Sequence, residues 1–233
     1  MNLAQTLEQL EAAGSAQTRK AYARHGITSK MFGVSYAVLG KLTRQIRCDH
    51  ALALGLWASG WHDARVLATM IADPQQATAA QLDAWVVDCD NRGIAGALST
   101  IAARSAVAEA VSAKWCADGR EFVAVAGWDV VGGLAMNSTL PDAKFAALLK
   151  TIERDIHGAQ NYVRYAMNGA LIGIGVRNAK LEKLAGAAAK RIGPVEVDHG
   201  DTDCKTRDAV AYIAKTKARR ARRGEKYSVF SNQ

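Results

Sequence analysis

The sequence predicts an all-α protein, and three observations carry that prediction. Alanine makes up about a fifth of the 233 residues, and the chain contains three prolines. Alanine loses no side-chain entropy in a helix, whereas proline interrupts one. Apolar residues recur at helical spacing along most of the chain, and no segment alternates apolar and polar residues as a half-buried strand does. We therefore expect helices throughout and no sheet.

Stripes of apolar residues define the expected helices in order. In the first half they are Leu3, Leu7 and Leu10; Leu39, Leu42 and Ile46; Leu82, Trp85 and Val86; and Leu98, Ile101, Val107, Val111 and Trp115. In the second half they are Phe145, Leu148, Leu149, Ile152 and Ile156; Val163, Ala166, Met167, Ala170, Leu171 and Ile174; and Leu181, Leu184, Ala188 and Ile192. The stripe from Val163 to Ile174 is apolar on most sides, so we expect that helix at the centre of the fold.

Proline and glycine separate these helices. Asp73-Pro74 ends one, Pro141 lies near the first turn of another, and Gly193-Pro194 closes the alanine-rich one. About ten helices of roughly 10–16 residues, joined by short loops, suggest antiparallel pairs that stack into a curved α-solenoid. We expect one domain over residues 1–214, followed by a tail over residues 215–233.

Positive charge is concentrated in that tail. The chain has a formal net charge of +8, and residues 215–226 (KTKARRARRGEK) hold seven basic residues and one acidic residue. The rest of the chain is therefore close to neutral. We expect a flexible tail, which is either a solvated extension or an arm that contacts phosphates without reading bases, since phosphate contacts release counterions whatever the sequence.

Several classes of protein are disfavoured by other signals. No run of about 18 uncharged apolar residues is present, and the N-terminus lacks the layout of a signal peptide. The cysteines, Cys48, Cys89, Cys116 and Cys204, are scattered, which favours reduced thiols over disulfides or a zinc site. No GxSxG, Walker or HExxH motif occurs. We expect a cytoplasmic protein with no membrane partner, no metal and no cofactor.

The densest polar stretch is residues 195–208. Its potential metal ligands are Asp198, His199, Asp201, Asp203 and Cys204. A metal is disfavoured because the stretch has neither a histidine pair at i,i+4 nor a second cysteine. Two interpretations remain. Thr202 or Asp203 caps a helix that begins near Cys204, or the start of that helix, with Lys205 and Arg207, binds an anion.

A second polar cluster lies in residues 85–92, where Asp88, Asp90 and Asn91 are grouped near the end of a helix. Carboxylates that are buried together can do acid–base work. Such a group more often caps the next helix, and we favour that interpretation. Residues 57–65 hold a third cluster, in which His62 and Asp63 are expected to end one helix and cap another.

Several motifs occur in an order that is informative as a set. They are Leu56-Trp57, His62-Asp63-Ala64-Arg65, Ile71-Ala72-Asp73-Pro74, Trp85-Val86-Val87-Asp88-Cys89-Asp90-Asn91, Asn161-Tyr162-Val163-Arg164-Tyr165-Ala166-Met167-Asn168, Leu171-Ile172-Gly173-Ile174-Gly175, Val197-Asp198-His199-Gly200 and Cys204-Lys205-Thr206. Together they resemble the AlkD-like DNA alkylation repair family of HEAT-like repeat DNA glycosylases, over roughly residues 20–215.

The resemblance implies a stack of HEAT-like helical pairs whose concave basic face grips duplex DNA. Active members excise positively charged 3- and 7-alkylpurines without a metal or an organic cofactor. This chain departs from them at four positions. Arg92 and Gly96 stand where active members carry a Trp and, four residues on, an Asp, while Val125 replaces a DNA-contacting Arg and Gly169 replaces a Trp of the cleft.

These substitutions change the expected chemistry. A carboxylate near the sugar stabilises the charge that develops as the base leaves, and the loss of one well-placed electrostatic group costs about 10²–10³ in rate. Arg92 in place of a tryptophan repels a cationic base and attracts a phosphate. We therefore predict a DNA-binding member of the family with weak or absent glycosylase activity.

The predicted DNA contacts are cations that meet the backbone and read its shape rather than its sequence. They are Arg44, Arg47, Arg92, Arg164, Lys205 and Arg207. We expect a monomer that binds duplex DNA, including alkylated or distorted DNA. Two alternatives stay open: a glycosylase that uses a displaced carboxylate (Asp88, Asp90, or Asp129 beside Trp128), and a helical-repeat scaffold that binds protein.

Overall fold

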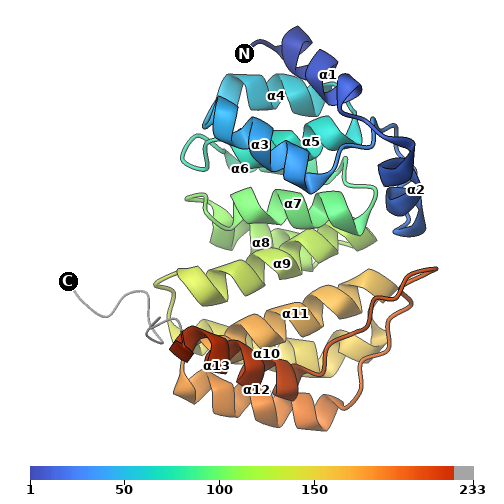
Figure 1. Ribbon diagram of the computed structural model, residues 1–233. Coiled ribbons are helices and arrows are strands. Elements are labelled where there is room, and N and C mark those ends of the chain that lie inside the picture. The colour runs from blue at the N-terminus through green and yellow to red at the C-terminus, as the bar shows by residue number, and fades with distance from the viewer. Residues whose placement is uncertain (223–233) are drawn as a thin grey trace. The chain divides into compact units, whose positions relative to one another are not determined.

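The computed structural model describes residues 1–222. In this part of the chain the regular elements are thirteen α-helices and one short 3-10 helix, without a strand (Figure 1). The prediction of an all-α fold is confirmed. The helices outnumber the expected ten, in part because the stripe from Leu98 to Trp115 is divided between two helices. No helix among the described residues is long and apolar enough to cross a membrane.

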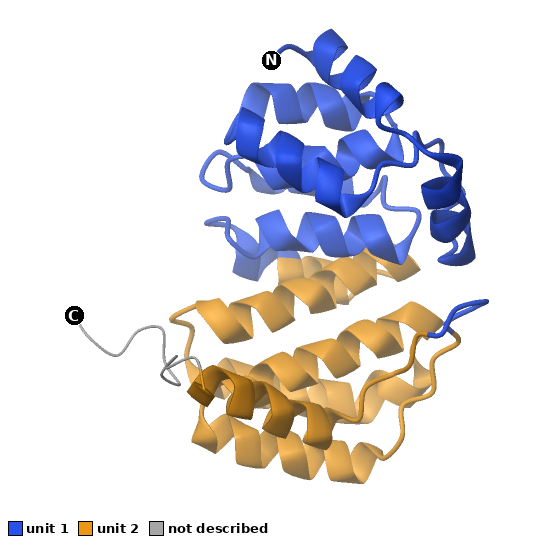
Figure 2. Ribbon diagram, viewed as in Figure 1, with its two compact units in different colours: residues 1–111, 199–203 blue, residues 112–198, 204–233 orange. Residues whose placement is uncertain are grey.

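The chain contains two compact units (Figure 2). Unit 1 comprises residues 1–111 and 199–203. Its helices are α1 (Leu3–Ala12), α2 (Ala16–Arg24), α3 (Tyr36–Ile46), α4 (His50–Ala58), α5 (His62–Ile71), α6 (Ala79–Val86) and α7 (Arg92–Ala102). The next helix, α8 (Ala108–Cys116), runs across the boundary at residue 111.

Helix α5 is the centre of unit 1. It packs against α1, α3, α4 and α7, and most of its side chains are buried. The helices around it begin where the sequence offers capping side chains: Asp49 accepts a hydrogen bond from the backbone N–H of Leu52 in α4, and Asn91 accepts one from Ile94 in α7. Capping side chains therefore mark where α4 and α7 start, and apolar burial decides which face of each helix turns inward.

Unit 2 comprises residues 112–198 and the chain from residue 204 onward. Its helices are α9 (Glu121–Asn137), α10 (Asp142–Asp155), the 3-10 helix η1 (Ile156–Gly158), α11 (Asn161–Arg177), α12 (Ala179–Ile192) and α13 (Ala209–Arg222). Helix α11 packs against α9, α10, α12 and α13 and is buried along most of its length. Its predicted central position is confirmed within this unit.

Glycines allow α11 to approach two neighbours closely. A Cβ on Gly173 would lie 3.0 Å from the carbonyl oxygen of Gly132 in α9. A Cβ on Gly175 would overlap Cδ1 of Ile213 in α13. A Cβ at Gly173 would press on the backbone of α9, and one at Gly175 would displace the Ile213 side chain, so these glycines help α9 and α13 to dock closely on α11.

The C-terminal region differs from the prediction. Helix α13 begins at Ala209 rather than near Cys204, and its cap is Asp208, whose Oδ1 accepts a hydrogen bond from the backbone N–H of Ala211 at 2.7 Å. Thr202 and Asp203 therefore do not cap it. The helix continues to Arg222, so residues 215–222 are helical rather than a flexible tail, in keeping with the high helix propensity of alanine, lysine and arginine. The rest of the predicted tail, residues 223–233, lies outside the described residues.

Candidate nucleic-acid interface

A groove of about 820 Å³ lies in unit 1, where residues of α2, α3, α5 and α7 meet. Two tyrosines, Tyr22 and Tyr36, and two arginines, Arg92 and Arg104, line it together with one histidine, three threonines and apolar residues. None of the described residues that line it is an aspartate or a glutamate. The groove therefore offers cations and aromatic rings but no carboxylate.

Two of the substituted family positions belong to this groove. Arg92 is the first residue of α7 and Gly96 lies one turn further on, and both line the groove. The other two lie in unit 2: Val125 is buried within α9, and Gly169 is exposed on α11 with open space around a Cβ placed there. The resemblance assigns the carboxylate to position 96, where Gly96 contributes only backbone to the wall of the groove.

The tyrosines of the groove stay neutral. Burial raises the pKa of Tyr36, with Arg92 partly opposing the effect, although 52% of this residue is exposed. Burial, together with the charge of Asp63, also raises the pKa of Tyr22. The Tyr22 hydroxyl donates a hydrogen bond of 2.7 Å to the carbonyl oxygen of Val34. Tyr36 is thus an uncharged, partly exposed residue of the groove. Tyr22 supports the wall of the groove through its hydrogen bond to Val34.

Asp63 holds the loop between α2 and α3, instead of capping a helix as expected. Its carboxylate is fully buried and accepts hydrogen bonds from the backbone N–H groups of Phe32, Gly33 and Val34 at 2.6, 3.2 and 2.7 Å. These three amide donors stabilise the negative charge of the Asp63 carboxylate, without an ion pair to a cation. This carboxylate therefore supports the groove wall and is occupied by structural contacts.

His62 is buried beside it, with its ring edge against Tyr22 at a centroid distance of 5.6 Å. Burial lowers the pKa of His62 below its usual 6.5, although Asp63 and Asp90 partly offset this effect. Near pH 6 the His62 ring therefore binds a proton in the unfolded chain but not in the folded chain, so protonation favours unfolding.

Stability should consequently fall as the pH drops below about 6.5 and should be retained above it. We expect the urea midpoint of unfolding to be lower at pH 5.5 than at pH 7.5, and the decrease to be smaller in His62→Gln. Circular dichroism at both pH values measures it. An equal decrease in wild type and variant would assign the effect to other groups.

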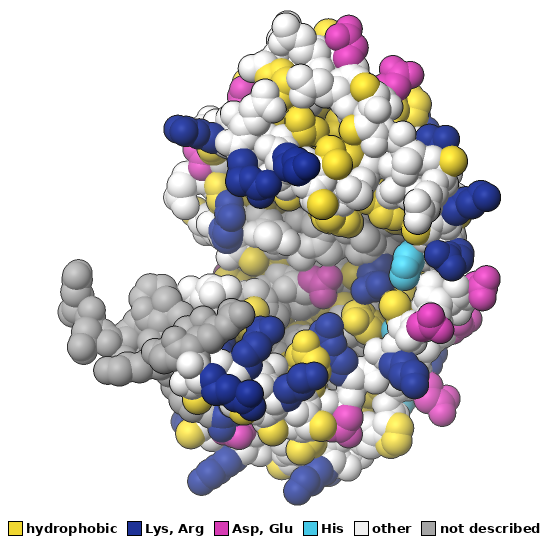
Figure 3. All heavy atoms as spheres, in the orientation of Figure 1, with side chains coloured by type: hydrophobic (Ala, Val, Ile, Leu, Met, Phe, Trp, Pro, Cys, Tyr) yellow, Lys and Arg dark blue, Asp and Glu magenta, His cyan; other side chains and the backbone are white. Residues whose placement is uncertain are grey.

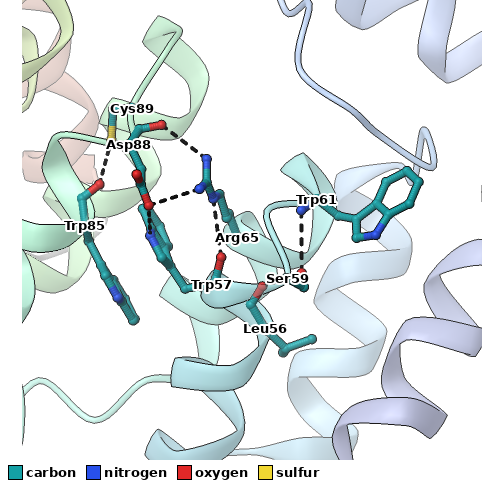
Figure 4. A network of polar contacts seen from close by, with 8 residues as sticks. All are labelled: Leu56, Trp57, Ser59, Trp61, Arg65, Trp85, Asp88 and Cys89. Carbon is teal, nitrogen blue, oxygen red and sulfur yellow. Dashed lines mark hydrogen bonds and ion pairs between the residues drawn. The ribbon is translucent and has the colours of Figure 1, made fainter.

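Asp88, the first candidate for a displaced catalytic carboxylate, is engaged in a structural network (Figure 4). Its Oδ2 accepts hydrogen bonds from Nε1 of Trp57 at 2.9 Å and from Nη2 of Arg65 at 3.0 Å. The rings of Trp57 and Trp85 stack in parallel with centroids 4.4 Å apart, and Arg65 lies over Trp57. The network ties the end of α6 to α4 and α5.

The other two candidates lie elsewhere. Asp90 is exposed and accepts a hydrogen bond from Nδ2 of Asn91 at 2.7 Å. Asp129 is half-buried in α9, and burial, with a smaller contribution from Asp129, raises the pKa of Cys116 to about 12. None of the three candidate aspartates lines the groove. The described residues that line the groove around Gly96 therefore include no carboxylate.

Three of the predicted DNA-binding cations belong to unit 1. Arg44 is exposed in the last turn of α3, Arg47 follows that helix, and Arg92 lines the groove. Arg47 has a φ of 68°, in the region that favours glycine. A residue with a side chain pays about 1 kcal/mol of backbone strain in this conformation. Figure 3 shows lysines and arginines gathered over α3.

The other three belong to unit 2. Arg164 donates hydrogen bonds from Nε to the carbonyl oxygen of Ala159 and from Nη1 to that of Glu196, at 2.8 and 3.2 Å, so its guanidinium supports the backbone. Lys205 and Arg207 are exposed ahead of α13 rather than in its first turn. The anion site expected at a helix start near Cys204 is therefore not formed in the way predicted.

Sequence reasoning did not find Arg104, Tyr22 or Tyr36. Arg104 lies in the link after α7 and the tyrosines lie in α2 and α3, so only tertiary packing places them around one groove. No local motif marks them. A signal existed only for Arg92, through its place in the family pattern.

The fold defines the class of protein. A solved structure described as "A new family of proteins related to the HEAT-like repeat DNA glycosylases with affinity for branched DNA structures" matches with a TM-score of 0.85 and 26% identity, over 98% of this chain and 97% of that one. The predicted HEAT-like helical-repeat class is confirmed. The family model of the DNA alkylation repair enzyme matches residues 6–213, and the chain belongs to that family.

Two bacterial relatives are similar over nearly the whole chain. The uncharacterized protein Lin0241 of Listeria innocua is 29% identical over 217 residues, which are 91% of this chain and 95% of the relative. The uncharacterized protein Lmo0209 of Listeria monocytogenes is 27% identical, with the same coverage. The match to the family model confirms the resemblance inferred from the motifs at the level of the family.

Proposed function

We propose that this protein binds DNA by contacts to the phosphate backbone and has weak or absent glycosylase activity. The observation that carries the proposal is the groove of unit 1, where Arg92 and Arg104 face the space and no aspartate or glutamate does. Membership of the DNA alkylation repair family makes DNA the ligand to consider first.

The charge of the groove argues against base excision. A cationic alkylpurine leaves through a transition state with positive charge on the sugar, which a nearby carboxylate stabilises. The groove has Arg92 at one family position and Gly96 at the other. Arg92 repels the cationic base, and the missing carboxylate costs about 10²–10³ in rate. The same guanidinium favours a phosphate, to which it can donate two hydrogen bonds.

Branched DNA is the preferred form in this proposal, with duplex DNA bound less tightly. The structurally similar family is described as having affinity for branched DNA structures. A branch point exposes unstacked bases, and Tyr36, a half-exposed residue of the groove, offers an aromatic ring for stacking with a base, worth about 1–3 kcal/mol per base. Arg92 and Arg104 beside it would hold the adjoining phosphates.

The test measures the affinity of Arg92→Gln/Arg104→Gln for a labelled four-way junction and for a duplex of the same sequence. We expect affinity for both to fall about tenfold or more, and the slope of log K against log salt to decrease by about 2, since each phosphate contact contributes about 0.9. The matched control is Lys20→Gln/Lys41→Gln, which removes two exposed lysines of α2 and α3 that do not line the groove.

Several outcomes would overturn the proposal. One is a wild-type protein that does not bind DNA, as the protein-scaffold alternative predicts. Another is an equal loss of affinity in the groove variant and the control. A third is rapid release of 7-methylguanine from methylated DNA that is abolished by an Asp→Asn change at Asp88, Asp90 or Asp129, which would establish the glycosylase alternative.

A further inference from the structure

We propose that the solvent face of α13 is a second surface that binds the DNA backbone, a proposal that rests on the proposed function. The helix contains no acidic residue, and its exposed positions hold only one valine, alanines and cations. After Val210 they are Ala211, Ala214, Lys215, Ala218, Arg219, Ala221 and Arg222. Figure 3 shows lysines and arginines gathered over this part of unit 2.

The cations of this face form a stripe along the helix. Lys215, Arg219 and Arg222 are spaced i, i+4 and i+7, which places them on one side of an α-helix over about 10 Å. One DNA strand carries a phosphate about every 3.4 Å of its axis, so the stripe spans about three phosphates. The alanines beside the stripe present no long side chain, and they let the helix backbone come close to a strand.

The opposite face of α13 is already occupied. Ile213 is buried where α13 crosses Gly175 of α11, and Ala209 is buried beside it. Lys217 forms an ion pair with Glu182 of α12. A basic amphipathic helix that binds a bilayer or a partner's groove needs a free apolar face. The apolar face of α13 is instead packed against the core of unit 2. A polyanion is the partner that suits the face that remains.

Arg207, just before α13, adds one positioned positive charge to the same unit. The guanidinium of Arg207 lies over the ring of Tyr212 in α13, 4.3 Å from its centroid. The carbonyl oxygen of Arg207 accepts a hydrogen bond of 2.9 Å from Nδ2 of Asn168. The ring of Tyr212 restrains the Arg207 side chain and Asn168 of α11 fixes its backbone, so that less side-chain entropy is lost when the guanidinium meets a phosphate.

The experiment compares two variants with the same change in charge. In Lys215→Gln/Arg219→Gln/Arg222→Gln the stripe is removed, whereas Lys150→Gln/Lys180→Gln/Lys183→Gln removes three exposed lysines of α10 and α12 in the same unit. We expect the first variant to bind duplex and junction DNA at least tenfold more weakly, with a salt slope smaller by about 2–3. The second should stay within about threefold of wild type.

A charge-retaining variant separates binding from folding. Arg219→Lys/Arg222→Lys should keep near-wild-type affinity, because backbone contacts need the charge rather than the guanidinium fork. If wild type binds DNA and the stripe variant behaves like its control, the role of α13 is refuted while the groove proposal stands. If wild type ignores DNA, the proposed function itself fails. Loss of binding to anionic lipid vesicles in the stripe variant, with DNA binding unchanged, would assign α13 to a membrane surface instead.

Discussion

Asp63→Ala is expected to lower the free energy of unfolding by about 3–5 kcal/mol, the largest effect of any single substitution considered for unit 1. The Asp63 carboxylate is fully buried and accepts three backbone hydrogen bonds from Phe32, Gly33 and Val34. Alanine leaves these amides buried without an acceptor, and each unpaired group costs about 1–3 kcal/mol. Urea unfolding followed by circular dichroism measures the loss.

Two comparisons sharpen this result. Asp63→Asn keeps one acceptor oxygen but turns an NH₂ group toward amides that also donate, so it should be destabilised, though less than the alanine variant. Asp90→Ala, at an exposed carboxylate of the same unit, should unfold like wild type. Because the loop that Asp63 holds carries the carbonyl bonded by Tyr22, the folded fraction of the variant should also bind DNA more weakly. Unchanged stability of Asp63→Ala would contradict the structural role.

Arg177→Ala should destabilise unit 2 by about 3–4 kcal/mol. Its guanidinium donates hydrogen bonds to the carbonyl oxygens of Ala135, Ser138 and Leu140 at 2.8–2.9 Å and to the carboxylate of Asp142 at 3.0 Å. One side chain therefore donates hydrogen bonds to acceptors at the end of α9, in the link that follows it and at the start of α10. Denaturant unfolding of the variant gives the difference.

The control variants test whether geometry or charge matters at Arg177. Arg177→Lys should recover only part of the loss, because a single ammonium group cannot reach all four acceptors in the fixed fork of a guanidinium. Arg154→Ala, which removes an exposed arginine paired with Asp155, should unfold like wild type. Equal stability of Arg177→Lys and wild type would reduce the role of Arg177 to its charge alone.

The helices could be predicted from the sequence because their signals are local. The apolar period of 3.6 residues located most helices, and the run from Val163 to Ile174 correctly placed α11 at a centre. Gly193, at the end of α12, has a φ of 72°, as expected of a glycine that closes a helix. The start of α13 was mispredicted because residues 201–208 offer several side chains that could cap a helix. The docking of Ile213 on α11 favours the start that Asp208 caps.

The candidate site could be predicted only in part. Arg92 and Gly96 follow from the family pattern, but the groove they line depends on Tyr22, Tyr36 and Arg104, which no spacing in the sequence links. The role of Asp63 escaped prediction for the same reason, since its partners lie about 30 residues away along the chain. Chemistry that depends on residues distant in sequence is decided by packing.

The division into two compact units bears on how the protein loses its structure. Asp63 anchors a loop within unit 1, and Arg177 joins helix ends within unit 2, so each unit has its own centre of buried polar contacts. Chains with separate cooperative cores depart from all-or-none melting, and a single midpoint then averages two equilibria. If unit 1 opens while unit 2 stays folded, hydrogen exchange will show two distinct sets of rates, one for each unit.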